Sequence, residues 1–138
     1  MKRILVAHDG SKSSDKAMKK ALGIAETFNA SVTVLSVIPE LYLTELMEMD
    51  RTRIVDTLTE ETKLMMNKIK SKPRKITLKT LIRQGNPAEE ILETARKMKA
   101  DVIVTGSHGR HGAQKFLLGS VSSKVVDYAE CDVLVVKK

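Results

Sequence analysis

The segment DVIVTGSHGRHGAQKFLLGSVSSKVVDYA (residues 101–129) joins an apolar run to a helix-like run through a glycine-rich loop. The run DVIVT (101–105) is apolar in its middle, as expected of a strand covered on both faces. The loop GSHGRHGAQKFLLGS (106–120) holds four of the chain's seven glycines. Glycine weakens regular structure by roughly 1 kcal/mol per interior position. Such a cluster predicts either an awkward loop or a close backbone approach to a ligand.

The same alternation of apolar runs and helical periods extends over the rest of the chain. Strands are predicted at 3–7, 31–37, 75–83, 101–105 and 132–138, and helices at 14–28, 86–98 and 120–129. Residues 41–70 keep a roughly helical period, which leaves open one helix or a loop followed by a helix. The order predicts one α/β domain over residues 1–138, an open five-stranded parallel sheet with helices on both faces.

Local patterns refine three of these elements. The first helix is expected to bury one apolar face made of Ala17, Met18, Ala21, Leu22, Ala25 and Phe28. The segment 75–83 alternates, as a strand near a sheet edge does. The helix at 86–98 has a strong start, with an N-cap, a proline at the first position and a glutamate three residues after the cap, namely Asn86, Pro87 and Glu89.

Length and composition exclude several classes of protein. The chain of 138 residues is long enough for one core without disulfides or metals. Its apolar runs fall far short of the roughly 20 residues of a membrane span, and the N-terminal apolar stretch is too short for a signal peptide. A cytoplasmic protein is therefore expected. The single cysteine, Cys131, is expected to be a small buried or half-buried apolar side chain.

The net charge of +7 is concentrated in one segment. Residues 63–83 carry eight basic residues and no acidic one, which could attract nucleic acid or another polyanion. The alternative is a solvated edge and loop. Two Phe, two Tyr and no Trp provide few stacking platforms for bases, which disfavours nucleic acid.

Two loops are candidates for a ligand site, because ligands of open parallel sheets bind at the carboxyl ends of strands where the strand order reverses. They follow the first and fourth strands, at 8–14 and 106–120. Neither has the P-loop or the dinucleotide-binding pattern. Glycines after the fourth strand and Gly-Ser at the start of the last helix nevertheless form a plausible two-part phosphate cradle, with Arg110 and Lys115 as added positive charge. The alternative is a long flexible loop with a serine N-cap.

The spacing of these glycines matches a known family. Gly106-x-x-Gly109, nine residues and then Gly119-Ser120 form the pattern G-2x-G-9x-G-[S/T], which resembles the ATP-binding branch of the universal stress protein (UspA) family. The segments ILVAHDGSKSSDKAMKKAL, GNPAEEILETARKMKADVIVTGSHGR and LLGSVSSKVVDYAECDVLVVKK are similar to the family's opening, middle and end. The resemblance is weakest over residues 40–75. It implies a Rossmann-like fold of the adenine nucleotide alpha hydrolase type.

The resemblance also implies roles for individual residues. Asp9 is implied to contact the ribose and to help hold Mg²⁺ or Mn²⁺ near the phosphates; the structural alternative is an Asx-turn or an N-cap. The backbone of Val37 is implied to contact the adenine edge. The residues implied to bind phosphates and ribose, through amides or a hydroxyl, are Gly106, Gly109, Gly119, Ser120, Val121 and Ser122. The implied cofactor is ATP, AMP or another adenine nucleotide.

Enzyme chemistry has weaker support. The stretch HGRH (108–111) differs from the HxGH motif of nucleotidylyltransferases, because its third position is Arg and it follows the fourth strand. His108 and His111 have no third metal ligand nearby in sequence, so solvated or phosphate-facing histidines are expected. Asp9 is a conceivable base without an acidic partner, which predicts at most slow ATP hydrolysis or autophosphorylation.

The leading hypothesis is an ATP-binding stress protein that acts as a nucleotide-dependent switch. Bound nucleotide would order the loop 106–120, and a protein partner would contact that surface. Relatives commonly dimerise through their last strands, which implies a homodimer through residues 133–136. Slow ATP hydrolysis or nucleotidyl transfer, and polyanion binding through residues 63–83, remain the alternatives.

Overall fold

The computed structural model describes residues 1–40, 48–108 and 118–137. Five strands and four helices alternate along these segments. They are β1 (Arg3–Ala7), α1 (Lys12–Phe28), β2 (Ser31–Pro39), α2 (Glu48–Ser71), β3 (Leu78–Gly85), α3 (Pro87–Met98), β4 (Val102–Gly106), α4 (Ser120–Tyr128) and β5 (Asp132–Val136). This is the predicted order of elements, and it resolves the open question over 41–70 for the described part, which is one long helix from Glu48 onward.

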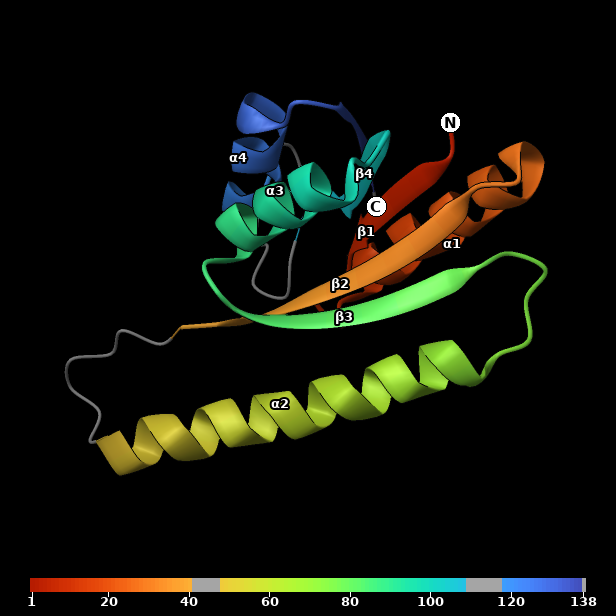
Figure 1. The fold of residues 1–138 in the computed structure, drawn as a ribbon. Coiled ribbons are helices and arrows are strands. Elements are labelled where there is room, and N and C mark those ends of the chain that lie inside the picture. Colours follow the sequence, from red (N-terminus) through yellow and green to blue (C-terminus); the bar gives the residue numbers. More distant parts are fainter. Residues whose placement is uncertain (41–47, 109–117, 138) are drawn as a thin grey trace.

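The five strands form one parallel sheet in the order β3-β2-β1-β4-β5. Helices α1 and α2 cover one face, and α3 and α4 cover the other (Figure 1). The predicted fold class is therefore confirmed. The strand order reverses at β1, where β2 lies on one side and β4 on the other. The predicted edge position of the third strand is also confirmed.

The core has two layers that follow from the alternation of side chains along buried parallel strands. On the α1/α2 face, Ile4, Val6 and Val104 pack with the apolar side of α1. On the α3/α4 face, Leu5 and Ile103 pack with apolar residues of α3 and α4. The central strands β1 and β4 are covered on both sides, as their continuous apolar runs predict.

Helix α1 begins at Lys12, two residues before the predicted start, because Ser11 is its N-cap. The Ser11 side chain accepts a hydrogen bond from the Ser14 amide at 3.1 Å. The predicted apolar face is buried apart from Leu22, which is partly buried, and Phe28, which is 57% exposed. The prediction for Phe28 was wrong because this residue lies in the last turn of α1, at the margin of the sheet, where little remains to cover it.

Helix α3 has the start that its sequence predicts. The Asn86 side chain accepts a hydrogen bond from the Glu89 amide at 3.1 Å, and Pro87 occupies the first helical position. Strand β2 extends to Pro39, and β3 runs from Leu78 to Gly85, so it begins three residues later and ends two residues later than predicted. Ile76 precedes the strand yet packs against the α1/α2 side of the core.

Two further expectations concern composition. Cys131 is half-buried against the α3/α4 side of the core, as predicted, and burial raises the pKa of its thiol. The protonated thiol is a poor nucleophile, so the structure gives Cys131 a packing role. Among the described residues, no helix is both long and apolar enough to cross a membrane.

Candidate functional site

The sheet brings the two candidate loops to one edge. Strand β1 pairs with β4 in parallel, with Ile4 beside Val102 and Val6 beside Val104. The carboxyl ends of both strands therefore meet, and the turn after β1 lies next to the exit of β4. Asp9 and Gly106 occupy these two positions. This is the point of strand-order reversal at which open parallel sheets bind ligands.

The turn between β1 and α1 is held by side chain to main chain hydrogen bonds. Oδ1 of Asp9 accepts from the Ser11 amide at 2.9 Å, which is the Asx-turn foreseen as the structural alternative. Gly10 has φ 86, a left-handed conformation that glycine adopts at little cost. The turn therefore holds the backbone of Asp9, a half-buried carboxylate residue, in one conformation.

The N-terminus of α4 is the second half of the site. Gly119 is its N-cap, with φ −62 and ψ 160, and no side chain among residues 1–40, 48–108 and 118–137 caps this helix end. The first intrahelical bond runs from the Ser123 amide to the Gly119 carbonyl at 2.9 Å. The preceding amides, which belong to Ser120, Val121 and Ser122, have no partner within the helix. Together with the helix dipole, they make this end suited to an anion.

The start of α4 rules out the serine N-cap and specifies the role of Ser122. A serine N-cap was the bland explanation of the Gly-Ser pair, but Ser120 is the first helical residue and caps nothing. The hydroxyl of Ser122 is buried and donates to the Gly106 carbonyl at 2.7 Å. Ser122 can therefore offer a ligand its amide, while its hydroxyl fastens α4 to the end of β4.

Gly106 is required for packing. An added Cβ would lie 2.3 Å from Oγ of Ser13 and 2.9 Å from the carbonyl carbon and oxygen of the same residue. The first turn of α1 therefore rests directly on the end of β4. Gly106 is absent from the residues with positive φ, so close helix–strand contact, and not backbone conformation, explains this glycine.

The remaining predicted residues fall into two groups. Val37 lies on β2, where its side chain packs on the α3/α4 side of the core; its backbone role stays a prediction. Gly109 and Arg110, together with Lys115 and His111, lie outside the described residues.

His108 is buried and not solvated as one expectation had it. It is 7% exposed, and its Nδ1 lies 2.9 Å from Oγ of Ser107. Its Nε2 has no hydrogen-bond partner in the part of the chain that the structure describes. The Ser107 carbonyl accepts a hydrogen bond from the Gly119 amide at 2.8 Å, which connects the end of β4 to the start of α4. His108 is the next residue after Ser107.

The described residues contain no cluster of three or more His, Cys, Asp or Glu side chains able to hold a metal ion. In the two candidate loops, 8–14 and 106–120, the acidic residue is Asp9. A divalent ion at this site would therefore need ligands beyond these side chains, of the kind that nucleotide phosphates supply.

The basic segment 63–83 is divided among the end of α2, a connection and β3. Seven of its eight basic side chains are exposed, and the eighth, Arg74, is partly buried. The Arg74 guanidinium donates to the carbonyls of Ile69 and Lys72, so it caps the end of α2. One member of the segment thus has a structural role, and polyanion binding by the others stays a prediction.

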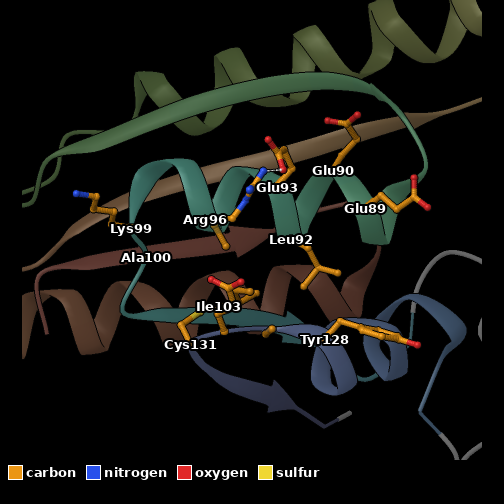
Figure 2. A pocket seen from close by; sticks show the side chains of 13 residues that line it. Glu89, Glu90, Leu92, Glu93, Arg96, Lys99, Ala100, Ile103, Tyr128 and Cys131 are labelled. Carbon is orange, nitrogen blue, oxygen red and sulfur yellow. Dashed lines mark hydrogen bonds and ion pairs between the residues drawn. The ribbon is translucent and has the colours of Figure 1, made fainter.

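A groove of about 700 Å³ lies along α3 and the end of α4 (Figure 2). Its floor includes Leu92 and Ile103, and its rim carries charged side chains such as Glu93 and Arg96, which form an ion pair. It extends to Ala100 and Cys131, which precede β4 and β5. None of the predicted site residues lines it.

Two residues of the site were missed or undervalued in the sequence. His8 is 4% exposed and bonds within the turn that carries Asp9. Ser13 forms the contact that Gly106 requires. The contact of Ser13 depends on the pairing of β1 with β4, which only the sheet order supplies. The bonds of His8 are local and carry no sequence pattern.

The fold and the site define a class of protein, a Rossmann-like α/β domain with an uncapped helix end at the point of strand-order reversal. The model described as the universal stress protein family matches residues 1–137. The chain belongs to this family.

Individual relatives agree with that assignment. The chain is 39% identical over 140 residues to universal stress protein MJ0531 of Methanocaldococcus jannaschii, covering 99% of this chain and 82% of the relative. The structure of hypothetical protein MJ0577 is similar with TM-score 0.89 and 33% identity, covering 99% and 96% of the two chains. The universal stress protein UspA from Lactobacillus plantarum has TM-score 0.87 and 29% identity, covering 98% and 97%.

Two more distant structures share the fold and carry nucleotides. A universal stress protein in complex with cAMP has TM-score 0.64 and 22% identity, covering 98% of this chain and 96% of its own. A family protein from Arabidopsis thaliana with AMP bound has TM-score 0.62 and 19% identity, covering 100% and 92%.

Proposed function

We propose that this protein binds ATP or another adenine nucleotide at the carboxyl ends of β1 and β4, as the ATP-binding branch of its family does. One observation carries the proposal: α4 begins without a side-chain cap, beside the end of β4. Three consecutive amides there lack an intrahelical partner. Val121 is half-buried and Ser122 is buried, and amides at such positions require an acceptor. Phosphate oxygens are acceptors of the right charge for them.

Each predicted residue has a role in this proposal. The amides of Ser120, Val121 and Ser122 bind phosphate, Gly119 lets the backbone approach the ligand, and Gly106 lets the first turn of α1 pack at this edge of the sheet. Asp9 accepts from the ribose hydroxyls and helps hold Mg²⁺ or Mn²⁺ together with phosphate oxygens. The Val37 backbone contacts adenine, and Gly109 and Arg110 complete the phosphate loop. The AMP-bound and cAMP-bound relatives support the ligand class by sharing the fold.

The α4 amides can be tested one at a time. Proline fits the first position of a helix and lacks an N–H, and Gly119 already has the extended conformation that a residue before proline prefers. Ser120→Pro should therefore keep the fold and remove one phosphate-binding amide. Ser120→Ala is the matched control, because it removes the hydroxyl and keeps the amide.

Isothermal titration with Mg·ATP measures both variants. We expect Ser120→Pro to weaken binding about tenfold, the effect of about 1.4 kcal/mol, and Ser120→Ala to stay within about threefold of the wild type. Equal affinity of Ser120→Pro and Ser120→Ala would show that the Ser120 amide does not bind phosphate. Absence of ATP binding by the wild type would end the nucleotide proposal itself.

The nucleotide is proposed to act as a switch in the stress response of a cytoplasmic protein, through a protein partner that recognises the liganded loop surface. Homodimerisation is proposed through β5, the edge strand whose residues 133–136 remain partly exposed. An edge strand left open is an association hazard, and pairing two copies closes it. A monomeric mass in light scattering at tens of micromolar protein would contradict dimerisation through β5.

A further inference from the structure

His8 directly follows β1, and its imidazole is enclosed by the turn that leads to α1. The residue is 4% exposed. Its Nε2 lies 2.8 Å from Oδ1 of Asp15, and its Nδ1 lies 3.1 Å from the amide nitrogen of Gly10. The amide of His8 donates to the Leu35 carbonyl at 2.8 Å, which extends the contact between β1 and β2 by one residue.

These two ring contacts determine which nitrogen carries the proton. A backbone N–H can only donate, so Nδ1 of His8 must present a lone pair to Gly10. In this arrangement Nε2–H donates a hydrogen bond to the carboxylate of Asp15, which only accepts when it is ionised. The two contacts of the ring are those of an Nε2–H tautomer.

The ring fixes the backbone on both sides of Asp9. His8 precedes Asp9 and is anchored by its buried ring and by its amide bond to β2. Gly10 follows Asp9, and its amide is held by the same ring while its φ is 86. The imidazole therefore fixes the residues before and after Asp9. In addition, Oδ1 of Asp9 accepts a hydrogen bond from the Ser11 amide at 2.9 Å.

We propose that His8 is a positioning residue of the nucleotide site, acting through Gly10 on Asp9, and that Asp15 selects its tautomer. The inference rests on the proposed function, in which Asp9 accepts from the ribose. A fixed position of the Asp9 carboxylate also limits the proposed ligands to ribonucleotides. A carboxylate held in one place can accept from both hydroxyls of a ribose, and a 2′-deoxynucleotide lacks one of them.

Two substitutions separate the ring's contacts. In His8→Asn, the side-chain oxygen takes the place of Nδ1 and can accept from Gly10, while the partner of Asp15 is lost. In His8→Gln, the amide group reaches the place of Nε2 and can still donate to Asp15, while the acceptor for Gly10 is lost. Asp15→Ala adds an exposed-site variant, because the Asp15 side chain is 68% exposed, so it leaves the core intact.

Titration calorimetry with ATP and with 2′-deoxyATP gives a readout that a loss of stability alone does not move. We expect His8→Gln to weaken ATP binding about tenfold, equivalent to about 1.4 kcal/mol, and to weaken 2′-deoxyATP binding much less. His8→Asn should retain most of the wild-type preference for ATP. In an Asp9→Ala background, His8→Gln should have no further effect, because its action passes through Asp9.

Asn86→Ala is the control for stability, because it removes the cap of α3 and leaves the β1–α1 turn untouched. Nitrogen-15 spectra of the histidine ring, recorded without nucleotide, should show a protonated Nε2 and an unprotonated Nδ1 in the wild type. Asp15→Ala should reduce that tautomer's population and lower ATP affinity in the same direction as His8→Gln.

The outcomes separate the two proposals. If the wild type binds ATP while His8→Gln and Asp15→Ala bind ATP and 2′-deoxyATP with wild-type ratios, the role of His8 is refuted and the nucleotide site stands. An Nδ1–H tautomer in the wild type also refutes it. If the wild type binds neither nucleotide, the proposed function fails and the role of His8 fails with it.

Discussion

Replacement of Gly106 by alanine tests the close contact between α1 and β4. The added Cβ would lie 2.3 Å from Oγ of Ser13 and 2.9 Å from its carbonyl carbon and oxygen. The hydroxyl can be displaced by a rotamer change, but the backbone atoms belong to the first turn of α1 and move only with the helix. Overpacking of this kind costs about 1–3 kcal/mol, and the backbone clash places Gly106→Ala at the upper end of this range.

Urea denaturation measures this cost. With an m-value of about 2 kcal/mol per molar, typical of a small domain, the midpoint should fall by about 1.5 M at unchanged m. Ser13→Ala removes the nearest of the three contacts and should therefore reduce the cost of Gly106→Ala in the double variant by about 1 kcal/mol. A midpoint for Gly106→Ala within about 0.2 M of the wild type would refute the packing argument.

Three other substitutions test separate features. Ser13→Ala alone should raise the free energy of unfolding by about 1 kcal/mol in urea, because Oγ of Ser13 is buried without a hydrogen-bond partner among the described residues. Asn86→Ala should lower it by about 1 kcal/mol through loss of the α3 cap; an unchanged midpoint would contradict the cap. The amides of Lys2 and Arg3 hold the pKa of Asp101 below its ordinary value of 3.8, so its contribution to stability is present above that value and is lost as the pH falls through the lower folded pKa. Thermal midpoints of Asp101→Asn should therefore fall less steeply than those of the wild type in this acid range, and parallel curves would argue against the two amide bonds.

Local sequence signals predicted the elements whose causes are local. The cap and proline at Asn86 and Pro87 determine where α3 begins, and both act within one turn of helix. Continuous apolar runs correctly indicated strands covered on both faces. The two described ends of the glycine-rich segment, Gly106 and Gly119, also lie at the edge where the strand order reverses, because alternating strands and helices restrict the topology.

Features that depend on tertiary contact were not predictable in this way. Phe28 has the right helical spacing for burial, yet the helix outruns the sheet that would cover it. The purpose of Gly106 was inferred from its backbone freedom, whereas the structure shows that Ser13, 93 positions earlier, occupies the space of a side chain. The exposure of Phe28 and the contact at Gly106 depend on which helices and strands are neighbours, and the periodicity of the sequence does not contain this information.

His8 shows the same limit at the functional site. A single histidine after a strand carries no pattern, and its two partners differ in kind, one a main-chain amide and one an exposed carboxylate. Gly10 beside Asp9 is recognisable as a turn. The connection between the ring and that turn appears only once the hydrogen bonds are in view.

The central claim, that an adenine nucleotide binds across the carboxyl ends of β1 and β4, is tested most directly by titrating the nitrogen-15-labelled protein with Mg·ATP and following its backbone amides. The account predicts saturable shifts at Ser120, Val121 and Ser122 and at Asp9 and Gly10, on both sides of the strand-order reversal. Shifts confined to the groove along α3, or no shifts at millimolar ATP, would contradict it.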